Sequence, residues 1–303
     1  MRAAARSSFD LLERTLAASR RLTPGQRLRH AGIVGRLRWR LAQRWPTTAE
    51  VRLLFDHLPP AEARRCAGKI AAGAARDRWV VATLSQRGID VLRPLVATAD
   101  SFATLRPPAV LTAFHVGGWN ALGPGLEALS APVLSLRQDA LYDPPPRIEI
   151  ATTHGDQQHR ARVFQRAVEH LHEDGFVVAT VDVWESSFHT ASCLGGELAV
   201  ARGPLALARL CSAPLVPVTA EWRSRQFLVE AHDPLAPPGD VDPVEAPDRW
   251  EKALASSTAR WLETYLRSRP DQTGLGLLRT LATSPASTYS PPTAEDAEIA
   301  ERS

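Results

Sequence analysis

Residues 110–127 read VLTAFHVGGWNALGPGLE, and this stretch decides the expected fold. Its first residues are apolar or β-branched and predict a buried strand that ends at His115. Gly117 and Gly118 allow a tight turn and the close approach of a substrate. A predicted helix begins near Trp119. Because the carboxyl ends of strands form the ligand crevice of an open α/β sheet, His115 is expected to lie in a site.

Short apolar segments alternate with helical segments on both sides of this stretch. The predicted strands are 109–114, 132–136, 176–181, 215–220 and 226–230, and the predicted helices are 118–130, 158–173, 203–212 and 248–267. This order predicts an α/β fold with a mostly parallel central sheet flanked by helices.

The chain before the α/β region is predicted to be helical. A helix begins at the capping sequence of Thr23 to Gln26 and ends before Pro46. It carries an apolar row at a spacing of four and an adjoining basic row, formed respectively by Ile33, Leu37, Leu41 and Trp45 and by Arg36, Arg40 and Arg44. Two interpretations stay open: a packed apolar stripe with a solvated arginine face, or a helix lying on an anionic membrane.

These patterns divide the chain into three parts. We expect residues 106–272 to form the α/β domain and residues 1–105 to form an N-terminal helical region that packs on it. Residues 273–303 are expected to be a disordered tail, since most of this segment is rich in Ser, Thr, Pro and acidic residues and lacks periodicity.

Composition narrows the class of protein. The 303 residues are 44% hydrophobic, and a net charge of +3 with a pI near 9.0 does not demand nucleic acid, so no DNA partner is expected. The three cysteines form no Cys-x-x-Cys pair, which gives no disulfide framework or zinc site. No apolar run approaches the ~18 residues of a spanning helix. We expect a cytoplasmic protein, soluble or peripheral at the inner face of the membrane.

The hexapeptide HVGGWN from His115 to Asn120 resembles the His-x-x-x-x-Asp/Glu block of the lysophospholipid-acyltransferase-like superfamily. It is most similar to the His-Phe-Gly-Asn-Trp-Glu form of the bacterial lipid A lauroyl and myristoyl acyltransferases. Further blocks follow in the family's order, at Leu134–Arg137, Gly175–Asp182, Gly203–Arg209 and Ala213–Val218, and an upstream block lies at 51–65. The similarity runs from about residue 30 to about residue 272.

The resemblance implies an acyltransferase that moves an acyl group from a thioester, acyl-CoA or acyl carrier protein, to a hydroxyl or amine of a lipid or glycolipid. No permanently bound cofactor is implied. His115 is the expected general base. Gly117, Gly118 and Trp119 are expected at the substrate, with their backbone N–H groups as oxyanion donors. Asn120 stands where the family has an acidic residue, and it is expected to orient His115 without supplying charge.

The missing carboxylate leaves several hypotheses open. Asp182, at the end of its own predicted strand, or Glu185 would supply the charge. An unassisted His115 would suffice for a strongly nucleophilic acceptor, such as a small specialised metabolite in natural-product biosynthesis. A tRNA-linked aminoacyl donor also stays open in that case, although no motif indicates it. The competing class is a catalytically degenerate homologue that binds acyl groups.

Two arginines are further candidates for substrate binding. Arg137 is expected either to bind the phosphate of a carrier or phospholipid-like acceptor or to pair with Asp139. Arg202, with Gly203 at a helix start, is expected to meet an anion or to be solvated.

Two other sites are considered and rejected. The segment 139–159 holds Asp and His residues without metal-ligand spacing and is predicted to be a mobile loop over the substrate, not a metal site. His170 is predicted to face solvent. Ser186 and its neighbours near His189 lack the elbow of a serine nucleophile.

Overall fold

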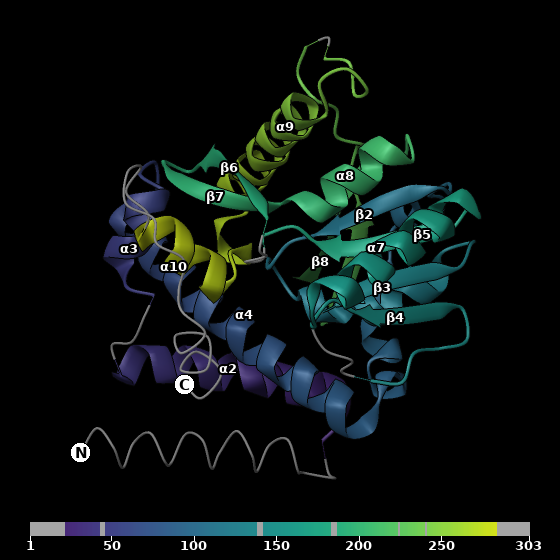
Figure 1. The fold of residues 1–303 in the computed structure, drawn as a ribbon. Coiled ribbons are helices and arrows are strands. Elements are labelled where there is room, and N and C mark those ends of the chain that lie inside the picture. The colour runs from purple at the N-terminus through teal and green to yellow at the C-terminus, as the bar shows by residue number, and fades with distance from the viewer. Residues whose placement is uncertain are drawn as a thin grey trace.

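A computed structural model describes residues 22–42, 46–137, 142–182, 187–223, 225–239 and 241–283. Its centre is a seven-stranded sheet with the order β1-β9-β8-β2-β5-β3-β4 (Figure 1). Neighbouring strands are parallel except for β8 and β9, which are antiparallel. The strands are β1 (Val96–Thr98), β2 (Ala109–Ala113), β3 (Val133–Arg137), β4 (Ile148–Thr152), β5 (Phe176–Thr180), β8 (Leu215–Arg223) and β9 (Gln226–Ala231). The predicted α/β class with a mostly parallel sheet is confirmed.

The remaining elements surround this sheet. The α-helices are α2 (Pro24–Ala42), α3 (Thr48–Leu54), α4 (Pro60–Arg87), α5 (Asp100–Ala103), α6 (Leu122–Gly125), α7 (Gln157–His172), α8 (Arg202–Leu210), α9 (Pro247–Ser268) and α10 (Leu275–Thr283). Short 3-10 turns are η1 (Ile89–Val91), η2 (Arg93–Leu95), η3 (Trp119–Ala121), η4 (Leu126–Ala128) and η5 (Pro270–Gln272). A separate antiparallel hairpin is formed by β6 (Phe188–Cys193) and β7 (Gly196–Ala201).

Alternate residues of the central strands point to two apolar layers, as the twofold repeat of a strand requires. One layer joins Val110 and Val177 of the sheet to α7, α8, α9 and α10. The other joins Leu111 and Val178 to α5 and α6. Burial of both faces explains why these strands read as continuous apolar runs.

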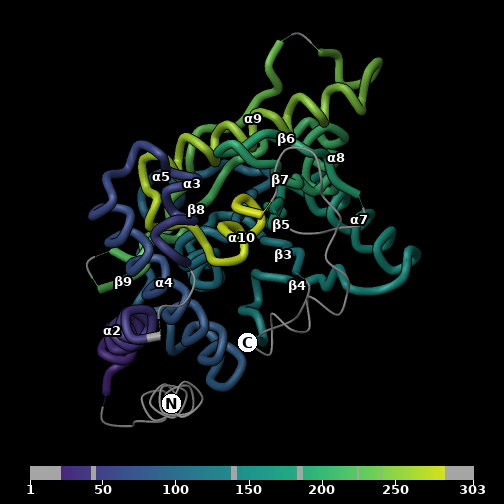
Figure 2. Tube along the Cα trace, turned by 90° about the vertical axis from the view of Figure 1, so that its left-hand side faces the viewer, coloured from purple at the N-terminus to yellow at the C-terminus, as the bar shows by residue number. Residues whose placement is uncertain are grey.

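Helices α2 and α4 lie side by side beyond the main sheet (Figures 1 and 2). They approach closely at Gly35, where an added Cβ would lie 2.6 Å from the Cβ of Ala75. The buried face of α2 is formed by Leu28, Ala31 and Val34.

Of the two interpretations of the apolar row on α2, the packed stripe is wrong for the three residues of the row that the structure describes. Ile33, Leu37 and Leu41 are 47%, 43% and 72% exposed. The glycines at 32 and 35 place the face of closest approach one position away from this row, because small residues allow the shortest interhelical distance. Trp45 and Arg44 lie outside the described residues.

Several predicted boundaries also need correction. The predicted helix 118–130 is three short turns, η3, α6 and η4, since Gly123, Pro124 and Gly125 interrupt a regular helix. The predicted loop 139–159 contains β4, which pairs in parallel with β3. The helical N-terminal region also supplies β1, which pairs with β9.

Two further corrections concern the tail and a histidine. The expected tail at 273–303 begins too early, because α10 buries Leu277, Leu278 and Leu281 in the core. His170 is buried, with its Nε2 3.2 Å from the carbonyl oxygen of Pro132, and does not face solvent. No helix in the described part of the chain is long and apolar enough to cross a membrane.

Candidate active site

His115 lies just beyond the carboxyl end of β2, the middle strand of the sheet. On the neighbouring strand β5, Thr180 is the register partner of Ala113. Two residues further on, the parallel register brings His115 level with Asp182. The His115 Nδ1 is 3.1 Å from Oδ1 of Asp182. The backbone N–H of His115 also donates to this carboxylate, 2.9 Å from Oδ2. One carboxylate therefore fixes both the backbone and the ring.

This pair sets the electrostatics of His115. The Asp182 side chain is 1% exposed, whereas that of His115 is 32% exposed. Burial lowers the pKa of His115, but the carboxylate of Asp182 and, to a smaller extent, that of Asp77 together outweigh burial, so the net pKa is raised. With Nδ1–H donating to Asp182, Nε2 keeps the lone pair that a general base requires.

The hydrogen bonds of Asn120 go to residues other than His115, which corrects the expected orienting role. Its side-chain Nδ2 donates to the carboxylate of Asp77, at 3.2 Å from either oxygen, and its Oδ1 accepts from Arg137 at 3.0 Å. Burial raises the pKa of Asp77 to about 6, although the hydrogen bonds from Asn120 oppose the shift. Asn120 thus joins α4, the His turn and β3 through hydrogen bonds.

The two glycines after His115 are explained by close packing. Gly117 has a φ of 60°, and an added Cβ would overlap the carbonyl oxygen of Ala220. At Gly118 an added Cβ would overlap the ring of Phe227. The N–H of Gly117 donates to the carbonyl of Gln272 at 2.6 Å, and that of Gly118 donates to Ala220 at 2.7 Å. Neither N–H is therefore available as the expected oxyanion donor.

The segment after η5 forms a wall of the site. From the sequence, this segment is expected to lie in the tail or beside it. Besides the bond from Gly117 to Gln272, Thr273 forms an isolated antiparallel bridge with Val116. Gly274 lies so close to the carbonyl of His115 that any side chain there would overlap it. In the sequence, only the glycine at position 274 indicates that the backbone comes close to another segment here. None of the blocks that resemble the family includes α10.

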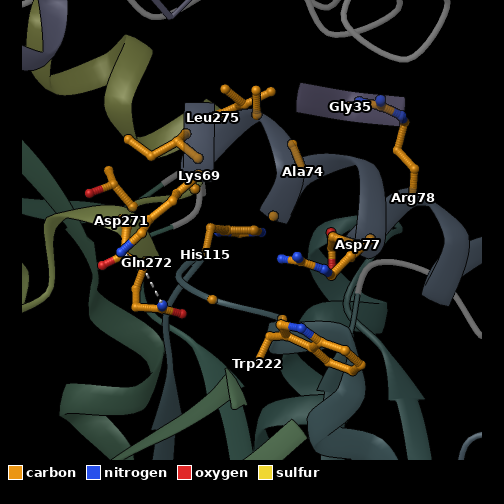
Figure 3. Close-up of a pocket in the computed structure, with 18 of the residues that line it drawn as sticks. Gly35, Lys69, Ala74, Asp77, Arg78, His115, Trp222, Asp271, Gln272 and Leu275 are labelled. Atoms are coloured by element: carbon orange, nitrogen blue, oxygen red, sulfur yellow. Dashed lines mark hydrogen bonds and ion pairs between the residues drawn. The ribbon is translucent and has the colours of Figure 1, made fainter. Parts of the chain in front are cut away.

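His115 opens into a cavity of about 1100 Å³, lined by α2, α4, the His turn and residues 271–276 (Figure 3). Figure 3 shows His115, Asp77 and Trp222 around this cavity, with Lys69 and Asp271 on another side. Cationic side chains outnumber acidic ones along it: Arg36, Arg38, Lys69, Arg76, Arg78 and Arg279 against Asp77 and Asp271. Lys69 and Asp271 form an ion pair of 3.4 Å. The cavity thus carries a surplus of positive charge beside His115.

No family model and no curated protein sequence matches the chain. Among solved structures, it is similar to the crystal structure of the 1-acyl-sn-glycerophosphate (LPA) acyltransferase PlsC from Thermotoga maritima. The identity is 13%, the match covers 78% of this chain and 98% of that one, and the TM-score is 0.35.

The other predicted site residues differ in whether they line the cavity. Trp119 lines the cavity, and its ring centroid is 4.6 Å from that of His115 in an edge-to-face arrangement. Arg137 lies over Trp119 at 5.5 Å and is bound to Asn120, so it supports the turn from behind. Glu185 and Asp139 lie outside the described residues.

Arg202 and Gly203 do not reach the cavity, which corrects their assignment to substrate binding. Arg202 begins α8 and pairs with Asp248 and with the buried Glu251. Arg209 also pairs with Glu251 at 3.0 Å. His189 lies 3.5 Å from the same carboxylate. Because two guanidinium groups already neutralise Glu251, this cluster is an ion-pair network and does not suit a metal ion.

Proposed function

We propose that this protein is an acyltransferase in which His115 takes the proton from an acceptor hydroxyl or amine. The observation that carries the proposal is the hydrogen-bonded pair of His115 and Asp182 at the opening of a large cavity. The acyl donor is a thioester of coenzyme A or of an acyl carrier protein. The cationic lining of the cavity suits a substrate that carries phosphate.

The proposed transfer accounts for each bond and each proton without a further catalytic group. As the acceptor oxygen or nitrogen attacks the thioester carbonyl, its proton passes to Nε2 of His115 and the new C–O or C–N bond forms. The C–S bond then breaks, and the imidazolium returns the proton to the thiolate. Asp182 stabilises the imidazolium in between, because a charge in this half-buried position is poorly solvated.

The oxyanion that develops needs a donor other than the N–H groups of Gly117 and Gly118. Trp119 is the first residue of η3 and lines the cavity directly after them. Its backbone N–H is the donor that we assign to the oxyanion.

A lipid acceptor is favoured by the surface of α2. Ile33, Leu37 and Leu41 form an exposed apolar row, flanked by exposed Arg36 and Arg40. An apolar row bordered by arginine suits the interface of an anionic membrane. Gly35, Arg36, Arg38 and Trp39 of the same helix line the cavity, so a bound membrane would lie beside its opening.

The test is acceptor-dependent release of free thiol from a panel of acyl-CoA thioesters. Wild type, His115→Ala and His189→Ala are compared, with a lysophospholipid or a primary amine as the acceptor. We expect transfer by the wild type and by His189→Ala, and a loss of at least about 10³-fold in His115→Ala. Full transfer by His115→Ala with the preferred acceptor would refute the proposal.

A further inference from the structure

Arg36 on α2 and Arg76 on α4 both lie in the cavity lining. Burial and, to a smaller extent, the charge of the nearby Arg36 together lower the pKa of Arg76 to about 10. Within the described part of the chain, no ion pair joins either arginine to a carboxylate. The two guanidinium groups thus repel each other, and no carboxylate of the described residues pairs with either of them.

The donors of Arg76 are only partly used. Its Nε is buried and has no hydrogen-bond partner among the residues described here. Its guanidinium carbon lies 5.3 Å from the centre of the Trp222 ring. The ring attracts the positive charge through its face, but it does not accept the N–H donors in the guanidinium plane. Arg76 is therefore positioned and still lacks an acceptor.

The packing of α2 against α4 keeps room for this side chain. At Gly32 an added Cβ would lie 2.6 Å from one terminal nitrogen of Arg76 and 2.7 Å from its Nε. Arg36 follows Gly32 by one helical turn, so the two arginines come from facing sides of the same helix crossing. An apolar side chain at position 76 would pack here at lower cost than an unpaired charge. The arrangement is therefore unfavourable for the empty protein and favourable when an anion is bound.

The arginines that were predicted to bind substrate do not serve this purpose. Arg137 donates to Asn120 and Arg202 is held by Glu251. Both arginines that the sequence offers as candidates for anion binding are thus bound to internal partners.

We propose that Arg36 and Arg76 bind a phosphate group of one substrate, so this inference rests on the proposed transfer reaction. Two guanidinium groups offer several planar donors, which matches the oxygens of a phosphate ester. Both substrates of the proposed reaction have forms that carry this group, namely the coenzyme A donor and a phospholipid-like acceptor.

Aromatic packing connects this anion site to His115. Arg76 lies on Trp222, the ring of Trp222 meets that of Phe227 edge to face at 5.1 Å, and Phe227 packs against Gly118. One aromatic pair thus separates the arginines from the His turn, and all lie along the same cavity. A ligand anchored by its phosphate would extend its remaining part towards His115.

Calorimetric titration of the full chain tests the site with two phosphate esters. Coenzyme A and sn-glycerol 3-phosphate are the probes, with pantetheine and glycerol as their phosphate-free counterparts. Wild type, Arg36→Met and Arg76→Met are compared with Arg64→Met, an exposed arginine of α4 that does not line the cavity. We expect wild type and Arg64→Met to bind at least one ester equally well. Each of the other two variants should bind it at least tenfold more weakly.

The identity of the bound ester distinguishes the two sources. Arginine-dependent binding of coenzyme A alone would assign the site to the donor, and that of glycerol 3-phosphate alone would assign it to the acceptor. The proposal is overturned if neither ester binds the wild type, or if Arg36→Met and Arg76→Met bind as the wild type does. It is also overturned if pantetheine and glycerol lose affinity in the same variants.

Two controls keep the result interpretable. Arg76→Lys retains the charge and loses the planar fork, so it should bind with intermediate affinity; it replaces Arg76→Met if that variant does not fold by circular dichroism. His115→Ala should bind the ester like the wild type while failing in transfer. Loss of transfer with intact binding would therefore concern the proposed base, and loss of binding alone would concern the anion site.

Discussion

The Nδ1 atom of His115 lies 3.1 Å from Oδ1 of Asp182, and the backbone N–H of His115 is held by the same carboxylate. The whole segment from β2 to β5 separates these residues in the sequence. The parallel register of the two strands brings them together. The acidic partner of the histidine therefore comes from a neighbouring strand end. Asn120, which is close in sequence, is bound elsewhere.

Asp182→Asn should reduce kcat by about 10³–10⁴-fold, since an amide neither stabilises imidazolium nor enforces the tautomer in which Nε2 is the base. The pH profile supplies a second readout. Transfer needs neutral His115, so its rate should rise with pH through a pKa above the ordinary 6.5. In Asp182→Asn the pKa of His115 loses the raising effect of this carboxylate, while burial still lowers it and only the smaller effect of Asp77 opposes burial, so the acidic limb should move to lower pH.

Glu197→Gln, at a partly buried acidic residue of the separate hairpin, is the matched control. It should keep both the rate and the position of the limb. An Asp182→Asn enzyme with an unshifted limb would show that another group governs the profile.

Asn120→Asp should lower the free energy of unfolding by about 1–3 kcal/mol at pH 7.5. The change replaces a donor to Asp77 by a second carboxylate at the same place, and like charges repel. It should not improve transfer, because residue 120 is hydrogen-bonded to Asp77 and Arg137 and His115 to Asp182. The exchanged pair Asp77→Asn with Asn120→Asp restores one amide, one carboxylate and the partner of Arg137.

Denaturant unfolding of the four proteins measures this coupling as a double-mutant cycle. The exchanged pair should recover at least half of the stability that Asn120→Asp loses. Equal losses in the single and the exchanged variants would mean that the contact between residues 77 and 120 is not what matters.

The sheet was predictable because its strands are buried on both faces and read as apolar runs separated by helical segments. The position of His115 followed from the same rule, since strand ends share one edge. Asp182 was predictable as one of two candidates, because it also ends a strand. Its contact with the backbone of His115 depends on register, and a single sequence does not give register.

Asp77 and the segment 271–276 were not predictable in this way. Asp77 is one acidic residue in a long helix that carries many charges, and only the crossing of α4 past the His turn partly buries it. Gln272 and Thr273 reach the turn through backbone atoms, which every sequence has. The sequence left open whether the apolar row of α2 is packed or exposed, because both arrangements have the same spacing of four.

Asp77→Asn should change the pH dependence of stability. The pKa of Asp77 rises from 3.8 to about 6 on folding, so the folded protein holds this proton to higher pH than the unfolded chain. The cost of ionising Asp77 is absent below about pH 4 and fully present above about pH 6, at an upper bound of ~3 kcal/mol. Between pH 4 and pH 7, the free energy of unfolding of the wild type should therefore fall by up to this amount relative to that of Asp77→Asn. Urea unfolding at several pH values measures it, and a difference independent of pH would contradict the buried carboxylate.

Ile33→Ser, Leu37→Ser and Leu41→Ser combined should weaken binding to vesicles of anionic phospholipid at least tenfold, because the exposed row loses its apolar area. Co-sedimentation at low salt measures the bound fraction. Leu53→Ser on α3 is the matched control, since Leu53 is 64% exposed and lies outside the row. Absence of binding by the wild type would count against a lipid acceptor and would leave the small-metabolite acceptor.

Gly117→Ala and Gly118→Ala should both lower stability and transfer, for different physical reasons. Gly117 has a left-handed φ of 60°, and an added Cβ would overlap the carbonyl oxygen of Ala220. A backbone atom relaxes away from such an overlap only at a high cost in free energy. We expect a loss of about 1–3 kcal/mol there. At Gly118 the obstacle is the Phe227 ring, which turns more readily but would shift Trp222 with it. Gly73→Ala, in the interior of α4 with open space around its Cα, should instead gain up to ~1 kcal/mol. Thermal unfolding of the three variants separates these cases, and a Gly117→Ala protein as stable as Gly73→Ala would mean that the turn is not held as the structure shows it.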